Sequence, residues 1–303
     1  MEAALALLTA RYVFPERAKD AAAAVRARMA AGEYDGLDES ALAERLTGAL
    51  FTLCGDRHLR VRVREEGMHD HLTDAELTAA YREQSRLGNY GIAQVRRLDG
   101  NVGYLDLHGV ADPVVAGRAI GAAMELVAHT HALIVDLRKN RGGTPDGVQL
   151  WHSHLFPDSD THLNDIFHTD TGGTRQYWTL AHVPGPRYLD RPVYLLTSAF
   201  TFSAGEEFAY NLKATRRATL TGETTRGGAH PTDVLPITPT LEITVPVARS
   251  INPITGTNWE GAGVEPDIAV PADEAFDVAY RMALEHVLTW TRRRPCWPRH
   301  ARP

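Results

Sequence analysis

The sequence predicts an α/β fold that follows a small helical N-terminal domain. A continuous apolar stretch at residues 132–137 is typical of a strand buried on both faces of a parallel sheet. Helical patterns alternate with such strands through the middle of the chain, which is the order of an α/β domain. The first 58 residues contain helical patterns only. We therefore expect a helical domain over residues 1–66, an α/β domain over residues 67–295 and a tail over residues 296–303.

The composition is that of a globular protein with a core of ordinary size. The chain has 303 residues, of which 44% are hydrophobic and 23% are charged. A formal net charge of -6 argues against general binding of nucleic acid. No stretch approaches the roughly 20 apolar residues of a membrane span, and the opening residues lack the positive region of a signal peptide. We expect a cytoplasmic protein with no membrane partner, and the distant Cys54 and Cys296 suit a reducing compartment.

The helical N-terminal part ends at a tight turn that contains a histidine. Pro15 suits the first turn of one helix, and Asp38 suits the cap of a second helix that ends before Gly55. His58 follows at once and leads into an alternating strand over residues 59–63. A histidine between a helix end and a strand is held rigidly.

His58 has two other interpretations on its sequence context alone. A lone loop histidine is more often a surface residue than a catalytic one. A metal pair formed by Cys54 and His58 is conceivable, but no further cysteine or histidine partner lies nearby, so no metal site is predicted. We expect Cys54 to pack in the helical core instead.

Strands and helices alternate from residue 76 onwards. Helices are expected over residues 76–87, 114–128, 147–156, 203–214 and from 276 to a point before 295, and strands over residues 92–98, 102–107, 132–137, 193–196, 218–220 and 241–247. A stretch between residues 163 and 178 has the glycines and aromatic residues of a hairpin that could line a substrate groove.

Ser203 lies where the strand over residues 193–196 gives way to a helix. The unpaired N–H groups and the macrodipole at a helix start favour developing negative charge, which suits a nucleophilic serine. Ser203 and Glu206 also form the S-x-x-E pattern of a capping box, in which the two side chains only satisfy backbone groups. This segment alone leaves both roles open, and the cap is the commoner one.

Two motifs, in a fixed order, resemble the tail-specific (C-terminal processing) protease family. Residues 134–143, IVDLRKNRGG, are similar to one signature of that family. Residues 197–208, TSAFTFSAGEEF, followed by GETTRGG at 222–228, are similar to its serine-nucleophile segment. With GVEPD at residues 263–267, the resemblance covers about residues 101–270. The resemblance is to the branch that includes interphotoreceptor retinoid-binding protein modules and the tricorn protease core. The short stretch between His58 and the strand at residue 92 points to the same branch, because it is too short for the PDZ domain that bacterial processing proteases usually carry there.

The resemblance implies a ClpP/crotonase-type fold and a serine peptidase that acts on a peptide or protein. It implies Ser203 as the nucleophile, His58 as the base and Glu260 as the group that completes the catalytic set. The backbone N–H groups of Gly142 and Ala204 are the implied oxyanion hole. No cofactor is implied.

Two positions depart from the family. Gly228 stands where the Ser-Lys members carry lysine, so their dyad is absent. The competitor of His58 as base is then His230, which follows Gly228 closely. With an ordinary pKa of about 6.5, His58 would give kcat/KM a limb at about pH 6 to 7. Arg57 stands where the tricorn core has a serine beside its histidine, which leaves the fourth member of the set open.

The same motifs allow two other functions. Retinoid-binding modules share them, so a non-proteolytic module for a hydrophobic ligand is one alternative. An activated serine on this scaffold can also serve another hydrolysis, acyl transfer or cyclisation. The combination of Ser203, His58 and Glu260 favours an enzyme, because a binding module needs none of the three.

Overall fold

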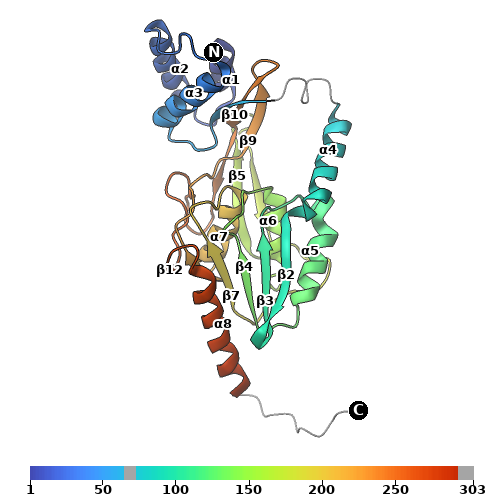
Figure 1. Cartoon of the computed structure of the whole chain (residues 1–303). Helices are drawn as coiled ribbons and strands as arrows, with labels where there is room; N and C mark the ends of the chain where they lie inside the picture. The colour runs from blue at the N-terminus through green and yellow to red at the C-terminus, as the bar shows by residue number, and fades with distance from the viewer. Residues whose placement is uncertain (65–72, 293–303) are drawn as a thin grey trace.

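The computed structural model describes residues 1–64 and 73–292 and has the predicted α/β architecture (Figure 1). The helices are α1 (Glu2–Arg11), α2 (Pro15–Ala30), α3 (Glu39–Cys54), α4 (Asp74–Leu87), α5 (Pro113–Val127), α6 (Pro145–Ser153), α7 (Ala204–Ala214) and α8 (Ala275–Arg292). The strands are β1 (Arg60–Val63), β2 (Ile92–Leu98), β3 (Val102–Leu107), β4 (Ala132–Asp136), β5 (His162–His168), β6 (Thr174–Trp178), β7 (Val193–Thr197), β8 (Thr219–Gly222), β9 (Thr232–Pro236), β10 (Leu241–Pro246), β11 (Ala248–Ile251) and β12 (Ile268–Ala269). Short 3-10 turns cover Asn89–Gly91 and Asp99–Asn101.

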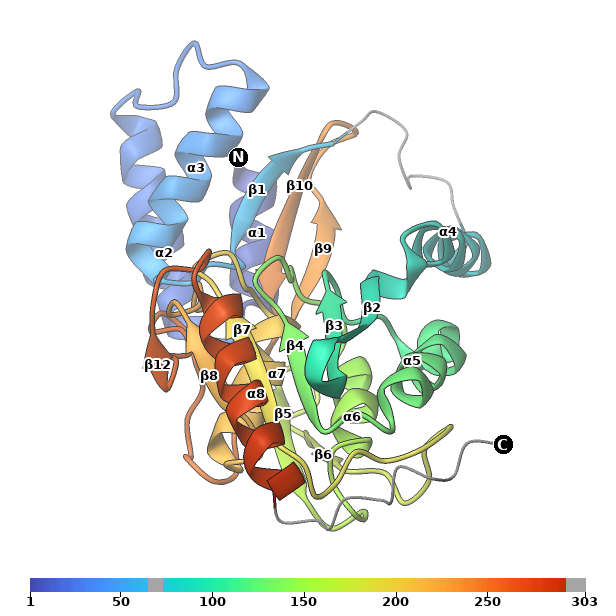
Figure 2. The same cartoon turned by 60° about the horizontal axis from the view of Figure 1, so that its bottom comes forward.

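A six-stranded sheet in the order β12-β8-β7-β4-β3-β2 forms the centre of the molecule. The pairs from β3 to β12 are parallel, and β2 runs antiparallel to β3. Successive residues of a strand point to opposite faces. Leu133 and Val135 of β4 therefore pack with α5, α6 and α7, whereas Ala132 and Ile134 pack with α8. Figure 2 shows α8 lying across one face of the sheet.

The N-terminal helices pack on a separate sheet, in the order β1-β10-β9. Helices α1 to α3 share one apolar core with Ile243 and Val245 of β10. Asp38 accepts a hydrogen bond from the Ala41 N–H at 2.8 Å, and Gly55 ends α3 with a φ of 70°. These local signals explain why the sequence placed both ends of α3 correctly.

The predicted elements agree with the structure within a few residues, and three short strands were not predicted. The hairpin expected between residues 163 and 178 is present as β5 and β6, and β11 completes their sheet. Strands β9, β11 and β12 were missed, because each is short and lacks a clear alternation of apolar residues.

Several expectations concern residues outside this description or without a test in it. The boundary predicted between residues 66 and 67 falls in the undescribed residues 65–72, and the tail and Cys296 fall in the undescribed residues 293–303.

Cys54 is a buried free thiol in the helical core, as expected. Of the helices that the structure describes, none is long and apolar enough to cross a membrane.

Candidate active site

Ser203 forms the sharp turn between β7 and α7 and lies at the carboxyl ends of the parallel strands. Its backbone has φ 56° and ψ -125°, a conformation that residues other than glycine rarely adopt. Strain of this kind persists only where the surrounding structure enforces it. The first N–H groups of α7 therefore point at the same place as the serine.

Glu206 ties this helix start to the loop that follows β8. Its buried carboxylate accepts hydrogen bonds from the N–H groups of Ser203 at 2.9 Å, Gly227 at 2.5 Å and Gly228 at 2.9 Å. The Thr225 hydroxyl donates a fourth at 2.6 Å. Burial raises the pKa of Glu206, and these four donors oppose that rise. Glu206, predicted as part of a capping box, therefore also holds the loop at residues 225–228 in place.

Asn140 connects the loop after β4 to the turn that contains Ser203. Its amide donates to the Leu107 carbonyl oxygen at 2.9 Å, and its side-chain oxygen accepts from the Gly142 N–H at 2.9 Å. Its backbone carbonyl oxygen accepts from the Phe202 N–H at 3.1 Å. The residue is fully buried, so the ends of three segments are held in one fixed arrangement.

The hydrogen bond from Gly142 to Asn140 bears on the predicted oxyanion hole. A Cβ atom at Gly142 would lie 2.8 Å from the Ser203 Cβ, so this glycine does adjoin the nucleophile. Its N–H group, however, is already donated to Asn140. Within the described ranges, the N–H groups of Ala204 and Gly143 have no hydrogen-bond partner. The Gly142 N–H that was expected to face the oxyanion is thus donated to Asn140, whereas the N–H groups of Ala204 and Gly143 are not donated to another group.

His58 lies in the turn between α3 and β1, where its ring stacks on Phe202 with centroids 4.4 Å apart. The Asp56 carboxylate accepts a hydrogen bond from the His58 backbone N–H at 3.0 Å. Burial lowers the pKa of His58 to about 4, an effect that Asp56 opposes and that Arg60 and Arg226 reinforce. The imidazole is therefore neutral and able to accept a proton over the whole physiological range.

Glu260 reaches the same histidine from the loop before β12. A ring nitrogen of His58 and carboxylate oxygens of Asp56 and Glu260 all lie within 4.8 Å of one another. Glu260 accepts hydrogen bonds from the backbone N–H groups of Arg57 at 3.3 Å and Ala229 at 2.5 Å. Burial, with Asp56 nearby, raises the pKa of Glu260 to about 7. Arg57 thus contributes its backbone to the site, while its guanidinium lies over the Phe51 ring.

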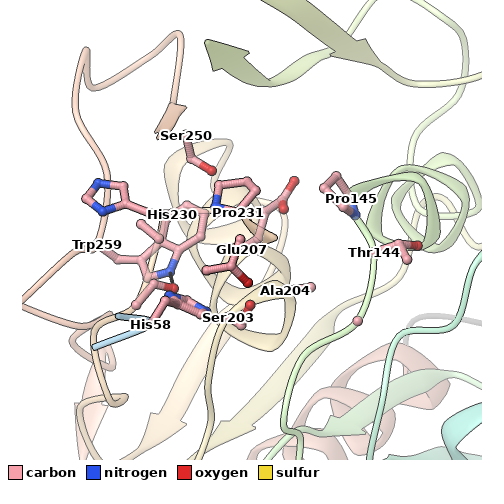
Figure 3. A pocket seen from close by; sticks show the side chains of 14 residues that line it. His58, Thr144, Pro145, Ser203, Ala204, Glu207, His230, Pro231, Ser250 and Trp259 are labelled. Atoms are coloured by element: carbon pink, nitrogen blue, oxygen red, sulfur yellow. Dashed lines mark hydrogen bonds between the residues drawn. The ribbon is translucent and has the colours of Figure 1, made fainter. Parts of the chain in front are cut away.

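His230 is held in a different way. Its Nδ1 lies 2.7 Å from an Asp56 oxygen and 3.5 Å from a Glu260 oxygen. The Tyr12 hydroxyl donates to the same Asp56 oxygen at 3.2 Å. Figure 3 shows the His230 ring turned away from Ser203. The His230 ring is thus held by Asp56 and Glu260 and does not face Ser203.

Asp56, His58 and Glu260 are also close enough together to serve as metal ligands. Asp56 already accepts hydrogen bonds from two side chains and one backbone N–H, and both Glu260 oxygens accept backbone N–H groups. A metal would have to replace these bonds. Cys54, whose pairing with His58 at a metal was judged conceivable but not predicted, is not a member of this cluster.

The close packing at Gly228 explains why lysine is absent there. A Cβ atom at this position would lie 2.8 Å from the His58 Cε1 and 2.3 Å from a ring carbon of Phe202. Any larger side chain would occupy the space that the histidine ring now fills. A lysine at position 228 and the present position of the His58 ring therefore exclude each other in this structure.

The Gly228→Ala variant should lose about 100-fold in kcat or more, because the added methyl displaces His58 from Ser203. Overpacking of this kind should also destabilise the fold by about 1 to 3 kcal/mol. Peptide cleavage and urea unfolding measure the two effects. As a control, Gly48→Ala adds a methyl in open space on α3 and should leave kcat unchanged.

Ser203 borders a cavity of about 280 Å³ (Figure 3). The cavity is bordered by Ser203, Ala204, Gly143, His58, Glu207 and other residues. Sequence reasoning singled out none of three residues in or near the site: Asn140, Phe202 and Glu207. All three lie inside the two motifs, and Glu207 is one helical turn after Ser203, so helical spacing could have identified it.

Comparisons with known proteins agree with this geometry. Residues 101–270 match the model of peptidase family S41. The carboxyl-terminal-processing peptidase 2, chloroplastic, of Arabidopsis thaliana is 29% identical over 175 residues, which is 53% of this chain and 32% of that protein. The chain thus aligns with about a third of the length of this curated relative.

Two solved structures have a similar fold at low sequence identity. A putative peptidase from Parabacteroides merdae aligns with a TM-score of 0.62 and 18% identity, over 93% of this chain and 95% of that one. The tricorn protease aligns with a TM-score of 0.58 and 13% identity, over 94% of this chain and 36% of that one. Because the family model covers more than half of the sequence, the chain belongs to peptidase family S41, a family of serine peptidases.

Proposed function

We propose that this chain hydrolyses peptide bonds through an acyl-enzyme on Ser203. His58 takes the hydroxyl proton as Ser203 attacks the carbonyl carbon, and it returns that proton to the leaving amine. Glu260 positions His58 and stabilises the imidazolium that forms. The oxyanion accepts hydrogen bonds from the N–H groups of Ala204 and Gly143. Water then repeats the sequence on the ester and releases the acid.

The observation that carries this proposal is the neutral, buried imidazole stacked on the residue that precedes a strained serine. Apolar ligand sites usually have cavities of roughly 300 to 1,000 Å³ with few polar groups. The cavity here measures about 280 Å³ and is bordered by two histidines, two serines and a glutamate. These properties favour a peptidase over the alternative of a hydrophobic-ligand module.

The finer fold assignment and the cellular context belong to the same proposal. The strand–helix units that end in an oxyanion hole at α7 support a ClpP/crotonase-type sheet. A peptidase implies a peptide substrate. The domain boundary at residues 66 and 67 and the cytoplasmic location stay predictions.

An activity-based fluorophosphonate probe tests the function. The probe forms a covalent bond only with an activated serine, so it should label the protein once, and peptide mapping should place the label on Ser203. Release of a chromophore from a mixed peptide library should then show turnover. A protein that is folded but neither labelled nor active on any peptide would favour the binding module.

A further inference from the structure

Glu207 lies in the wall of the cavity that contains Ser203, one turn further along α7 (Figure 3). Residues four positions apart share one face of a helix, so the carboxyl group and the nucleophile border the same space. The side chain is only 3% exposed. None of the catalytic steps described above uses it.

The carboxyl group has no cationic partner among the residues that the structure describes. Asp146 on α6 acts on it electrostatically but is also negative, and is itself paired with Arg175. The amides of Asn164 and Asn211 face the carboxyl group, yet neither amide nitrogen completes a hydrogen bond of normal geometry. Burial raises the pKa of Glu207 to about 7, and the two amides oppose that rise.

A buried carboxylate without a cation is destabilising. Glutamine at this position would face the same amides without bringing a charge into the interior. The charge is therefore better explained by a ligand than by the fold. A cation that enters the cavity from solvent would form the ion pair that Glu207 lacks.

We propose that Glu207 binds the cationic side chain of the substrate residue whose carbonyl Ser203 attacks, so that this peptidase cleaves after lysine or arginine. The proposal rests on the proposed function, because that residue must enter the cavity beside Ser203 and Gly143. A cavity of about 280 Å³ suits one long side chain rather than a whole ligand. Trp259 and Pro231 border it and offer apolar surface to the methylene stem.

Peptides that differ only at the cleaved residue test the proposal. The wild type should cleave the lysine and arginine peptides with a kcat/KM about 100-fold above that of the leucine peptide. Glu207→Gln should remove this preference by lowering kcat/KM for the lysine and arginine peptides about 100-fold. The leucine peptide and the rate of fluorophosphonate labelling should change by less than about threefold. Asp146→Asn is the matched control, because it removes a nearby charge outside the cavity lining and should keep the preference.

The ratio of lysine to leucine cleavage isolates Glu207 from the catalytic groups. Both peptides need Ser203 and His58, so the ionisation of these groups cancels in the ratio. The ratio should rise with pH through about 7 as Glu207 ionises, and it should be flat in Glu207→Gln. Asp146 from α6 and Tyr177 from β6 face the same carboxyl group, so Asp146→Asn should move the midpoint to lower pH.

Peptide binding to a variant that cannot cleave gives the same comparison without turnover. In the Ser203→Ala background, the lysine peptide should bind at least about 10-fold more tightly than the leucine peptide, and adding Glu207→Gln should equalise them. Equal binding before that second substitution would overturn the proposal. A parallel loss of lysine and leucine cleavage in Glu207→Gln would show that the carboxyl group only supports the fold. Absence of labelling and of cleavage in the wild type would count against the peptidase itself.

Discussion

Replacing Ser203 with alanine should lower kcat for peptide cleavage by about 10,000-fold or more and abolish fluorophosphonate labelling. The expected loss is large because the serine carries the covalent step, whereas the oxyanion donors that remain supply only a small residual rate. Steady-state cleavage at saturating peptide measures the effect. Labelling or turnover that survives in the pure variant would assign the nucleophile to another residue.

The stability of two variants distinguishes the catalytic role from a capping role. Ser203→Ala should change the free energy of unfolding by no more than about 1 kcal/mol, as for a lost cap. Ser203→Gly should be equally inactive but more stable than Ser203→Ala by about 1 kcal/mol, because glycine adopts a φ of 56° without strain. Urea unfolding of both proteins gives the comparison. Equal stability would mean that the turn is not strained.

His58→Ala should lose nearly as much activity as Ser203→Ala, and the double variant should lose little more. Groups that act as one unit are not additive, so a multiplicative loss in the double variant would contradict a shared role. The matched control is His230→Ala, which removes a partner of Asp56 and should cost at most about 10-fold. Inactivity of His230→Ala together with an active His58→Ala would reverse the assignment.

The pH profile of the leucine peptide gives this assignment a second measurement. Because burial lowers the pKa of His58, the base limb of kcat/KM should lie near pH 4, not between about 6 and 7 as an ordinary histidine would give. Activity should fall only as the pH drops through that limb, where the imidazole becomes protonated. A limb near pH 7 that disappears in Glu260→Gln would report Glu260 instead, whose pKa is raised to about 7.

Local signals in the sequence were sufficient for most of the fold. Asp38 and Gly55 determine the ends of α3 through their own hydrogen bond and backbone angle, so no distant residue is needed to predict them. The four residues of β11 form a strand only because β5 lies beside them. Pairing of this kind depends on tertiary contacts that a pattern along the chain does not contain.

The sequence predicted which residues come together at the site, but not the details of their contacts. The ordered motifs predicted catalytic roles for Ser203 and His58; the structure brings both residues to one cavity, and their roles stay predictions. The sequence could not show that the Gly142 N–H donates a hydrogen bond to the Asn140 side-chain oxygen, because that bond depends on the rotamer of Asn140. Nor could it show the low pKa of His58, which comes from burial by residues far away along the chain.

The antiparallel pairing of β1 with β10 has a consequence for the protein during its synthesis. Val61 lies opposite Ile243, and the Arg57 N–H bonds Glu260, so the turn that holds His58 is completed by residues made about 180 to 200 positions later. A ribosome adds roughly 5 to 20 residues per second, so the segment from Ser203 to Glu260 takes about 3 to 11 seconds, during which the serine and the histidine have both been made but are not aligned. Under the proposed function, the nascent polypeptide is therefore inert toward its neighbours on the ribosome until the segment around Glu260 has emerged.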